Sequence, residues 1–524
     1  MKQRTVVFLF ALLVLLPLVS VFGTGIMEAR NFISAQSMAL DGDWLIPHLF
    51  TEIRLNKPPL PVWLTAPVFL LDPHPSMLAL HIPVILVTAL MAVFCVDLHE
   101  DICGKSRASL YAGLVAASML MTIKLGVTNS WDIYSVAFMT GALASLLKPG
   151  RGWLVGGILC MAASVMSKGP VQLYTMLLPF LAASLICRRP GAFTRGFWKR
   201  VAAVLGLGCL LGCLWYVIVY LAVPHEAATV AKGEVHAWSN RHLASFFFYL
   251  SFPIFAGAWL LPLLASLFGR WLNGGESGEL DGEIGEARRA RRFLLCWFLI
   301  SLLLLSLVPE KKERYLMPAF IPLALMTAST LHMWVQKMKE GSLSRIESGL
   351  IRWHLRLGTL AAVGICLFIA WHNSAQILYI LPFAVLCVCF GLLGEKKNSL
   401  VVFVSCMLIL CTAFAAWRGG STRPVMQKKA PTCPLEEFRT LPRLDGLPFF
   451  SLHGFSPVEE WEAGRDMTQV KELAAIAEPR FVLYDDRGRN LDRLAEAGLH
   501  VAERFLIQTS RGRYLDFFVV ERRP

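Results

Sequence analysis

Long, nearly uninterrupted blocks of apolar residues constrain this chain more than any other feature. Of its 524 residues, 56% are apolar and 17% are charged, whereas a soluble domain has about 45–50% and about 25%. A bilayer core of roughly 30 Å needs about 20 apolar residues in each helix that crosses it. The blocks therefore exclude an ordinary soluble enzyme and indicate a polytopic membrane protein.

The blocks predict about thirteen transmembrane helices. Met1–Arg4 would also suit the basic start of a signal peptide, but the apolar stretch after it lacks a small-x-small cleavage site, so we expect it to be retained. The predicted spans cover residues 5–23, 77–97, 108–123, 129–147, 153–167, 172–187, 201–223, 246–269, 293–309, 315–335, 357–372, 376–393 and 399–417.

The distribution of lysine and arginine predicts the orientation. The N-terminal segment and every second loop after it hold 23 of the 50 basic residues, the other loops hold 10, and residues 418–524 hold 17. Because basic loops stay in the cytoplasm, we expect a cytoplasmic N-terminus and, after thirteen crossings, a periplasmic C-terminal region. The net charge of +13 then needs no nucleic-acid partner, and we expect none.

Two regions divide the chain. Residues 1–417 form the predicted membrane domain, whose large first outer loop, 24–76, we expect to pack as short interfacial helices. Residues 418–524 predict a small α/β domain with strands at 480–484, 501–507 and 514–521 and a helix at 490–497. Most of the thirteen cysteines lie in apolar blocks without zinc-binding spacing, and the C-terminal domain holds only Cys433, which excludes an internal disulfide there.

Ionisable residues gather in the outer loops, where other basic residues are scarce. Each one alone is compatible with an interfacial side chain that reaches toward water. Together they predict an anion-binding cavity at the outer leaflet, because charges at membrane depth mark functional sites. The candidates are Glu28, Arg30, Lys57, Asp132, Lys168, His236, Arg241, Lys311, Lys312, Arg314 and Tyr315.

Two of these candidates suggest chemistry by their residue type and position. Glu28 directly follows the first span, where a carboxylate could act as a general base or could simply mark the end of the helix. Lys57 precedes two prolines, which hold it on a stiff, extended segment. An ammonium group fixed in this way is a good point-charge partner for phosphate.

Several motifs together resemble one family. Glu28-Ala29-Arg30, Gly42-Asp43-Trp44-Leu45-Ile46-Pro47, Lys57-Pro58-Pro59-Leu60-Pro61-Val62-Trp63, Ser167-Lys168-Gly169-Pro170 and the segment from Lys311 to Pro318 are similar to those of the bacterial aminoarabinose transferase (ArnT-like) family. This family is a branch of the integral-membrane GT-C glycosyltransferases and is related to the protein O-mannosyltransferases. The order and spacing match over residues 1–335.

The resemblance implies a fold and a reaction. The fold is that of a mainly α, polytopic GT-C membrane protein with a C-terminal periplasmic domain, located in the bacterial inner membrane. The reaction is the direct, inverting transfer of a sugar from an undecaprenyl-phosphate donor to lipid A or another envelope glycan. No cofactor and no metal are expected.

The resemblance also implies roles for individual residues. Met27 replaces an acid that the family motif usually carries, and Asn56 replaces a frequent glutamate. The implied catalytic residues are Glu28 and Asp132; the implied ligands of the donor phosphate are Lys57, Arg241, Tyr315 and Arg30; and the implied substrate-binding residues are Lys168, His236 and Lys312.

Other interpretations remain open at this point. The acceptor could be a protein hydroxyl, as for a protein O-mannosyltransferase-like enzyme. A polytopic lipid or glycan transporter would also carry buried charges, although transporters often show internal repeats, and none is evident here. A structural assembly protein is a third alternative. The C-terminal domain could be a cap that packs over the cavity or a recognition domain.

Overall fold

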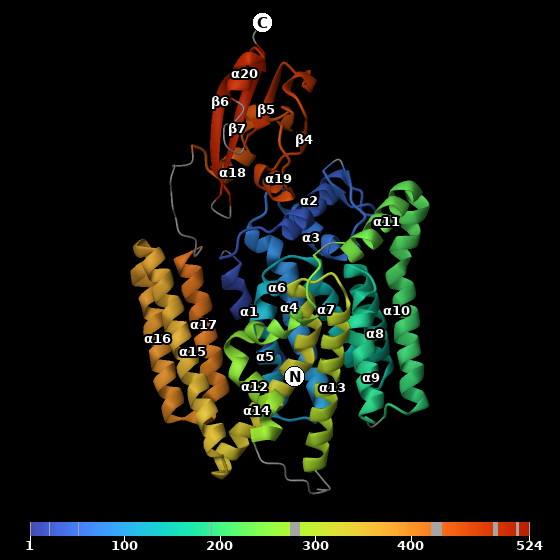
Figure 1. Cartoon of the computed structure of the whole chain (residues 1–524), viewed down its shortest axis with the longest axis vertical. Helices are drawn as coiled ribbons and strands as arrows, with labels where there is room; N and C mark the ends of the chain where they lie inside the picture. Colours follow the sequence, from blue (N-terminus) through green and yellow to red (C-terminus); the bar gives the residue numbers. More distant parts are fainter. Residues whose placement is uncertain are drawn as a thin grey trace.

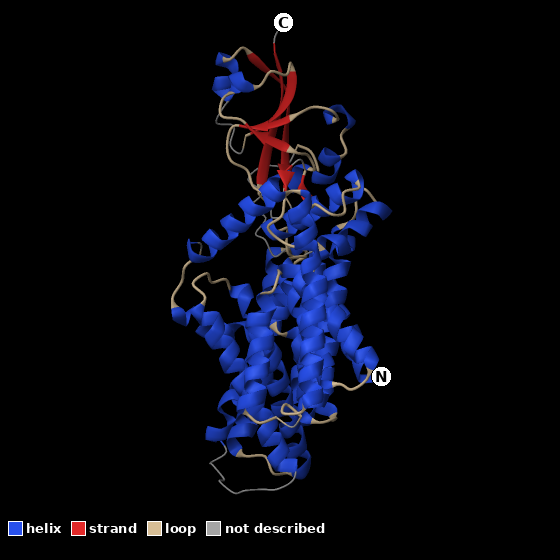
Figure 2. Cartoon of the chain, turned by 90° about the vertical axis from the view of Figure 1, so that its right-hand side faces the viewer, coloured by secondary structure: helices blue, strands red, loops and turns tan. Residues whose placement is uncertain are grey.

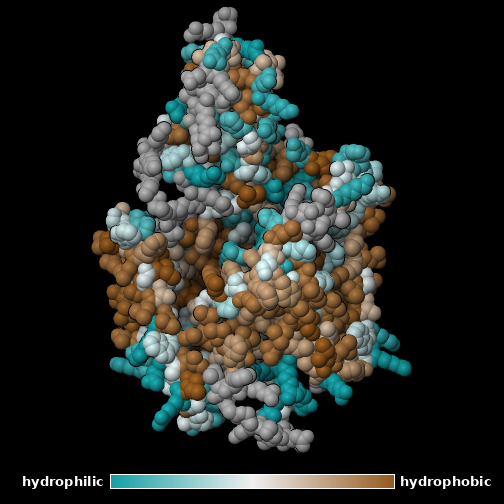
Figure 3. Space-filling view, in the orientation of Figure 1, coloured by the Kyte–Doolittle hydropathy of each residue, from teal (hydrophilic) through white to brown (hydrophobic). Residues whose placement is uncertain are grey.

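The computed structural model describes residues 2–19, 21–50, 52–189, 191–240, 242–272, 283–420, 432–485, 491–509 and 513–522. It has two parts, a large helix bundle and a smaller sheet domain above one end of it (Figure 1). We call the end of the bundle that carries the sheet domain the domain face and the opposite end the far face. On the face of the bundle that Figure 3 shows, an apolar band lies between more polar ends, as expected for a protein that crosses a membrane.

The elements of the bundle, in chain order, are α1 (Lys2–Leu15), η1 (Leu16–Leu18), α2 (Ile26–Asp41), β1 (His48–Leu49), β2 (Glu52–Ile53), α3 (Leu60–Leu71), α4 (Met77–Cys103), α5 (Arg107–Ser118), α6 (Leu120–Gly126), α7 (Trp131–Leu147), α8 (Arg151–Lys168), the π-helix η2 (Leu173–Leu177), α9 (Leu178–Ile186), α10 (Arg195–Ala222), α11 (Pro224–Asn240), η3 (Phe246–Trp259), α12 (Leu260–Leu272), α13 (Glu283–Leu307), η4 (Glu313–Leu316), α14 (Met317–Glu340), α15 (Arg345–His372), η5 (Ser374–Gln376), α16 (Ile377–Lys396), η6 (Asn398–Leu400) and α17 (Val401–Gly419).

Each of the thirteen predicted spans overlaps a helix or a pair of consecutive helices. Within the described residues, eight helical segments are long and apolar enough to cross a membrane, and a ninth is obtained if α5 and α6, which meet at 57°, count as one broken span. Shorter helices such as α7, with 17 residues, occupy other predicted spans. The predicted fold class is confirmed, while the number thirteen stays a prediction.

Local sequence signals explain where several helices begin and end. α4 begins after Ser76, whose side chain accepts a hydrogen bond from the backbone N–H of Ala79. α15 begins at a capping box in which Ser344 and Glu347 each accept a backbone hydrogen bond from the other. α14 ends at Gly341, which adopts a φ of +69°, a conformation that glycine reaches without steric cost.

Small residues allow close helix packing inside the bundle. Gly208 and Gly212 lie one turn apart on α10 and face Met161 and Val165 of α8. A Cβ added to Gly208 would lie 2.5 Å from the Cβ of Met161. Such contacts are typical of membrane helices, which associate through van der Waals packing because lipid is as apolar as their side chains.

The strands of the sheet domain, red in Figure 2, lie beyond one end of the bundle. They form one mixed five-stranded sheet with the strand order β4-β3-β5-β7-β6. β3 is parallel to β4 and β5, whereas β7 is antiparallel to β5 and β6. The elements are α18 (Leu435–Arg439), η7 (Pro442–Leu444), β3 (Phe449–Ser451), α19 (Pro457–Ala463), β4 (Met467–Gln469), η8 (Leu473–Ala475), β5 (Arg480–Tyr484), α20 (Leu491–Glu496), β6 (Leu499–Gln508) and β7 (Tyr514–Arg522).

Both faces of this sheet are apolar. Side chains on successive strand residues point to opposite faces, so Phe517 and Phe518 enter two different clusters. Phe517 packs with Phe438 and Phe449, and Phe518 packs with Phe481 on the other side. Burying each of these rings contributes about 1.5–3 kcal/mol relative to leaving it exposed, which explains how a domain of this size has a core on each side.

The sheet domain rests on the first outer loop through α19. Trp461 of α19 packs against Phe32 of α2, with ring centroids 5.1 Å apart, and against Phe69 of α3 at 6.3 Å. Arg439 of α18 covers the same indole, with its guanidinium carbon 4.5 Å from the ring centroid. The loop therefore forms helices, as predicted, and these helices join the two parts of the molecule.

Candidate functional site

Asp132 lies at the centre of a charged group at the domain face. It occupies the first turn of α7 and is 3% exposed. Its Oδ1 is 2.5 Å from Nζ of Lys168, and its Oδ2 is 3.3 Å from Nε of Arg314. Lys57 interacts electrostatically with Asp132 and with Lys168. We call Lys57, Asp132, Lys168, Arg314 and Tyr315 the Asp132 cluster.

The sequence places these side chains through rigid local structure. The indole N–H of Trp131 donates to the carbonyl of Pro58 at 3.0 Å, which fastens the Lys57-Pro58-Pro59 segment to the start of α7. The guanidinium carbon of Arg54, which is buried, lies 4.5 Å from the centroid of the Trp131 ring. The ammonium that precedes two prolines is therefore held beside the carboxylate that follows Trp131.

Lys168 reaches the cluster from the end of α8. The helix stops at Gly169, which has a φ of +78°, and its N–H still donates to Val165. An L side chain at this position would be strained, so the glycine allows the chain to turn directly after Lys168. The Lys168 ammonium then lies 4.2 Å from the centroid of the Tyr315 ring, a distance at which cation–π attraction contributes.

A second ion pair borders the cluster. Nζ of Lys312 lies 2.5 Å from Oε1 of Glu310, and the hydroxyl of Tyr315 donates to the same oxygen at 3.4 Å. Lys311 instead donates to the backbone carbonyls of Ser306 and Val308 near the end of α13. Of the three basic residues in this short loop, Arg314 is therefore the one that is paired with Asp132.

The charges of the Asp132 cluster do not balance. Among the described ion pairs, the one buried carboxylate of Asp132 pairs with two bases, Lys168 and Arg314, while the charge of Lys312 is offset by Glu310. Removing charges from water strengthens both attraction and repulsion between them. A group with excess positive charge at the edge of the membrane is therefore suited to hold an anion such as a phosphate.

Glu28 lies in a neighbouring polar network. Its carboxylate is buried and accepts from the backbone N–H of Gly25 at 2.8 Å and of Asn129 at 3.2 Å. Its Oε1 also lies 2.9 Å from Nε2 of His81, a buried residue of α4. Since Asn129 is only three residues before Asp132, Glu28 is linked to the Asp132 cluster through the backbone of residues 129–132.

Glu28 and His81 form a buried hydrogen-bonded pair. Nδ1 of His81 lies 2.6 Å from the carbonyl oxygen of Met77, which can only accept a hydrogen bond, so Nδ1 carries a hydrogen. Nε2 is then the ring nitrogen that faces Glu28. No pattern in the sequence points to His81, because a single histidine near the start of a long apolar block does not differ from other isolated polar residues in such blocks.

Buried amides extend this network across four helices. Nδ2 of Asn31, on α2, donates to Oδ1 of Asn129 at 2.8 Å, and the hydroxyl of Tyr134, on α7, donates to the same oxygen at 2.9 Å. Nδ2 of Asn129 donates to the carbonyl of Leu80, on α4, at 2.7 Å, and to the hydroxyl of Thr65, on α3, at 3.1 Å. These bonds fix the chain just before Asp132.

The remaining predicted site residues have different outcomes. Arg30 is half-buried on α2, two residues after Glu28. His236 belongs to α11, but its side chain lies outside the described residues, as does Arg241 altogether. Within the described part of the chain, no group of three or more His, Cys, Asp or Glu side chains is arranged to hold a metal ion.

Comparisons with known proteins place these observations in context. Residues 241–388 match the Alg9-like mannosyltransferase family. The chain is 28% identical over 353 residues to the undecaprenyl phosphate-α-4-amino-4-deoxy-L-arabinose arabinosyl transferase of Pectobacterium atrosepticum, which covers 63% of this chain and 59% of the relative. The transferase of the same name from Pseudomonas aeruginosa is 28% identical over 366 residues, 64% of this chain and 60% of the relative. The matches thus span about three fifths of the length of these relatives.

The likeness in structure covers nearly the whole chain. The crystal structure of ArnT from Cupriavidus metallidurans bound to undecaprenyl phosphate superposes with a TM-score of 0.71 over 98% of this chain and 97% of that protein, at 16% identity. The structure of the same protein in the apo state gives the same values. The chain therefore has the fold of ArnT, C-terminal domain included, and the predicted resemblance to the ArnT-like glycosyltransferases is confirmed.

Proposed function

We propose that this protein transfers a sugar from a polyprenyl-phosphate donor, with undecaprenyl phosphate as the carrier, to an acceptor at the domain face of the membrane. The observation that carries this proposal is the Asp132 cluster, a buried carboxylate with three surrounding cations at one end of an apolar bundle. The similarity to arabinosyl transferases with an undecaprenyl-phosphate donor in their name supports the same donor class.

The proposed chemistry follows from the charge that develops during transfer. The bond between the anomeric carbon and the phosphate oxygen breaks, and the phosphate leaves with additional negative charge. Lys57, Lys168 and Arg314 would stabilise that charge from fixed positions, as preorganised donors do in other active sites. In a site that excludes water, three cations can provide this stabilisation without requiring a metal.

A carboxylate must take the proton of the acceptor hydroxyl. We assign this role to Glu28, as the resemblance implies, with Asp132 orienting Lys168 and Arg314 and thereby the phosphate. The hydrogen bonds from Gly25, Asn129 and His81 restrict the carboxylate of Glu28 to one orientation. In this assignment His81 fixes the direction of the base and is a positioning residue.

The acceptor class and the orientation in the membrane form part of the proposal. We propose lipid A or another envelope glycan as the acceptor and the periplasm as the side on which transfer occurs, with the cytoplasm at the far face. The excess of basic residues in the far-face loops supports this orientation. The match of residues 241–388 to a mannosyltransferase family favours hexose donors as a second candidate class.

Transfer by the purified, full-length protein tests the proposal. The protein in lipid nanodiscs is supplied with undecaprenyl-phosphate-linked aminoarabinose or hexose and with lipid A, and the products are identified by mass spectrometry. A sugar added to lipid A, and lost with Asp132→Asn, is the expected result. Unchanged lipid A and envelope glycans after gene deletion, together with altered lipid transport, would instead support a transporter.

A further inference from the structure

The sheet domain reaches the proposed active site through a tryptophan. Trp461 of α19 is 5% exposed and belongs to the same apolar cluster as Phe32 of α2, Phe69 of α3 and Trp131 of α7. Of these four residues, Trp461 comes from the sheet domain and the other three come from the bundle. Trp131 directly precedes Asp132, the centre of the Asp132 cluster. The sheet domain therefore completes an apolar core that extends to the proposed site.

Two aromatic contacts lead from Trp461 to the proposed base. The ring centroids of Trp461 and Phe32 are 5.1 Å apart, and those of Phe32 and His81 are 5.5 Å apart with an angle of 75° between the rings. Rings prefer such edge-to-face arrangements, because the positive edge of one ring meets the negative face of the other. Nε2 of His81 in turn lies 2.9 Å from Oε1 of Glu28. A displacement of Phe32 would therefore also displace the imidazole that contacts Glu28.

The helix α2 provides a second connection, because it carries both Glu28 and Phe32. Residues four positions apart lie on the same face of a helix, and both of these side chains are buried. Phe32 packs against Trp461, while Glu28 faces His81. Holding Phe32 in place therefore also fixes the rotation of α2 about its axis, which determines where the carboxylate of Glu28 points.

The sheet domain holds Trp461 itself in one position. The helix that carries it, α19, begins at a capping box and ends at Gly464, which has a φ of +68°. Arg439 of α18 covers the indole of Trp461, with its guanidinium carbon 4.5 Å from the ring centroid. Nε of Arg439 also donates to the backbone carbonyl of Glu462 at 3.1 Å. Because α18 and α19 are joined in this way, the domain can restrain α2 instead of moving with it.

We propose that the sheet domain positions the catalytic base, with Trp461 as a positioning residue that acts through Phe32 and His81 on Glu28. This inference rests on the proposed function, in which Glu28 takes the proton of the acceptor hydroxyl. A misplacement of about 1 Å in an active site can cost about 10²-fold in rate, so the orientation of this carboxylate matters. The domain thus contributes to catalysis although Trp461 does not touch the reacting atoms.

Transfer kinetics of the whole protein in nanodiscs test this role. Trp461→Ala should lower kcat about tenfold per folded molecule, because the base is less well oriented. KM for the polyprenyl-phosphate donor should stay unchanged, because the Asp132 cluster is intact. Trp461→Phe keeps a ring against Phe32 and should restore most of kcat. A normal kcat in Trp461→Ala, or a loss that appears in KM alone, would overturn the proposal.

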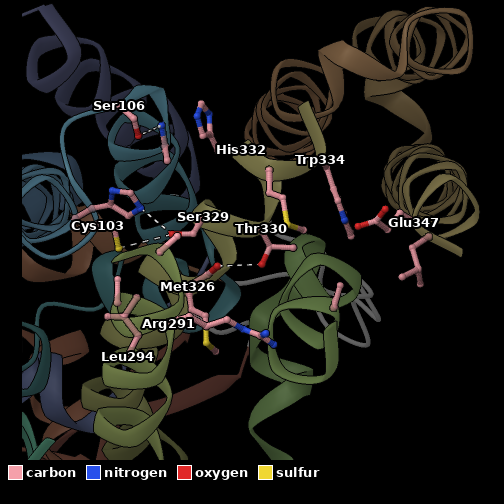
Figure 4. Close-up of a pocket in the computed structure, with 17 residues that line it drawn as sticks. Cys103, Ser106, Arg291, Leu294, Met326, Ser329, Thr330, His332, Trp334 and Glu347 are labelled. Atoms are coloured by element: carbon pink, nitrogen blue, oxygen red, sulfur yellow. Dashed lines mark hydrogen bonds between the residues drawn. The ribbon is translucent and has the colours of Figure 1, made fainter. Parts of the chain in front are cut away.

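A tryptophan at the far face provides the matched control. Trp334 of α14 is 1% exposed and lines a cavity of about 310 Å³ at the end of the bundle opposite to the Asp132 cluster (Figure 4). Trp334→Ala removes the same buried side chain as Trp461→Ala, so it should also lower Tm, but kcat per folded molecule should not change. Equal losses of kcat in the two variants would mean that Trp461 has a structural role only.

A double variant shows whether Trp461 acts through His81. Since both changes would release the same carboxylate, Trp461→Ala combined with His81→Phe should be no slower than the slower single variant, whereas independent effects would multiply and overturn the proposal. Phe32→Leu removes the middle ring and takes the place of Trp461→Ala if that variant does not fold.

Hydrogen exchange of α2 gives a readout that does not depend on transfer. The amides of α2 should exchange faster in Trp461→Ala than in wild type or Trp334→Ala, because the helix has lost its contact with the sheet domain. Absence of transfer by the wild type would overturn the proposed function and with it the role of Glu28. Transfer by the wild type together with normal exchange of α2 in Trp461→Ala would overturn only the role of the sheet domain.

Discussion

Two groups of charged side chains lie at opposite ends of the bundle and differ in their charge balance. At the domain face, the ion pairs among the described residues give Asp132 two basic partners, Lys168 and Arg314. At the far face, three acids meet three bases, so the positive and negative charges are equal in number. We call this second group the Asp97 network; it consists of Arg4, Asp97, Glu100, Asp101, Lys148 and Arg189.

Short ion pairs link separate segments in the Asp97 network. Nη2 of Arg4 lies 2.6 Å from Asp97 and 2.7 Å from Glu100, which ties α1 to α4. Nζ of Lys148, just after α7, lies 3.2 Å from Asp97 and 3.3 Å from Asp101. Each of the three acids has a basic partner within 4 Å, and Arg189 donates to the backbone carbonyl of Asp101, which is the pattern of a structural contact.

The comparison shows that charge at a membrane edge can have two different uses. A balanced group holds helices together and needs no ligand. An unbalanced, buried group costs free energy unless something compensates its excess charge, so it is the better candidate for a binding site. The number of basic residues in a loop does not distinguish a structural group from a binding site. The distinction depends on how many acidic side chains the fold brings near those basic residues.

Removing Asp132 should have the largest effect. Asp132→Asn leaves Lys57, Lys168 and Arg314 without their shared partner, and we expect transfer to fall by at least about 10²-fold and stability by about 3–5 kcal/mol. The measurement is initial transfer rate per folded molecule, together with Tm in nanodiscs. Asp97→Asn, in the balanced network, should lower Tm but keep the rate. Similar losses of rate in both variants would contradict the comparison.

Changing Glu28 should separate base catalysis from positioning. Gly25 and Asn129 donate to different oxygens of Glu28, so Glu28→Gln keeps an acceptor for one of these N–H groups only. Because the amide cannot take up a proton, we expect transfer to fall by about 10²–10⁴-fold, the usual contribution of a general base. The pH profile of kcat should lose one limb. His81→Phe should reduce kcat less and retain that limb. Near-normal turnover in Glu28→Gln would remove the base assignment and leave Glu28 as a helix cap.

Lys57→Ala should weaken transfer by about 10²-fold, the loss typical of one preorganised donor. Tm should change little, because Lys57 is half-buried and Asp132 keeps Lys168 and Arg314. The loss should appear in kcat/KM for the phosphate donor, measured at saturating acceptor. Lys148→Ala is the matched control from the Asp97 network, where we expect a lower Tm and an unchanged kcat/KM. Unchanged donor kinetics in Lys57→Ala would exclude Lys57 from the site.

Much of the fold could be predicted from the sequence, because apolar blocks and basic loops act over many residues. All thirteen predicted spans overlap helices, and the predicted strand 480–484 coincides with β5. β3 and β4 were missed because each has three residues, too few to show an alternating pattern. Their pairing with β5 depends on residues distant in the chain, which local patterns do not report.

The sequence predicted which residues belong to the candidate site better than it predicted which of them form ion pairs with one another. The sequence indicated Asp132 and Lys168 from their places near the ends of spans and Lys57 from the two prolines that follow it, and the structure brings these residues together. It did not indicate that Glu310 would offset Lys312, since a carboxylate two residues away can point anywhere. Nor did it indicate His81, whose role depends on α2 and α4 lying side by side.

A third group of charged side chains consists of acids, and it lies between the sheet domain and the first outer loop. Glu460 of α19 is buried where the sheet domain meets the first outer loop, and burial, with the nearby charges of Asp466, Glu52 and Glu459, raises its pKa to about 7. Since its ordinary pKa is lower, Glu460 is protonated more readily in the folded protein, and its contribution to stability is present in acid and lost as the pH rises through 7.

Glu460→Gln should therefore flatten the pH dependence of stability. Between about pH 5 and about pH 8 the wild-type protein should lose on the order of 1–2 kcal/mol from this group, and the variant should lose less. Unfolding of the sheet domain, followed by the fluorescence of Trp461, the one tryptophan in residues 418–524, measures the difference. Glu496→Gln, a change in α20 of the same domain, serves as the control. Parallel pH profiles for wild type and Glu460→Gln would show that this carboxyl group does not titrate in that range.

The smallest effect is expected for an exposed ion pair on the far-face half of α15. Nε of Arg356 lies 2.8 Å from Oε1 of Glu395, but the two side chains are 52% and 41% exposed. Solvent screens such pairs, so Arg356→Gln should change stability by less than about 0.5 kcal/mol. Glu347, on the same helix, pairs with Lys337 and also caps the helix through Ser344, and Glu347→Gln should cost more, about 1–2 kcal/mol. Chemical or thermal unfolding in the same nanodiscs compares the two variants, and equal costs would mean that burial and capping do not decide which charges stabilise this bundle.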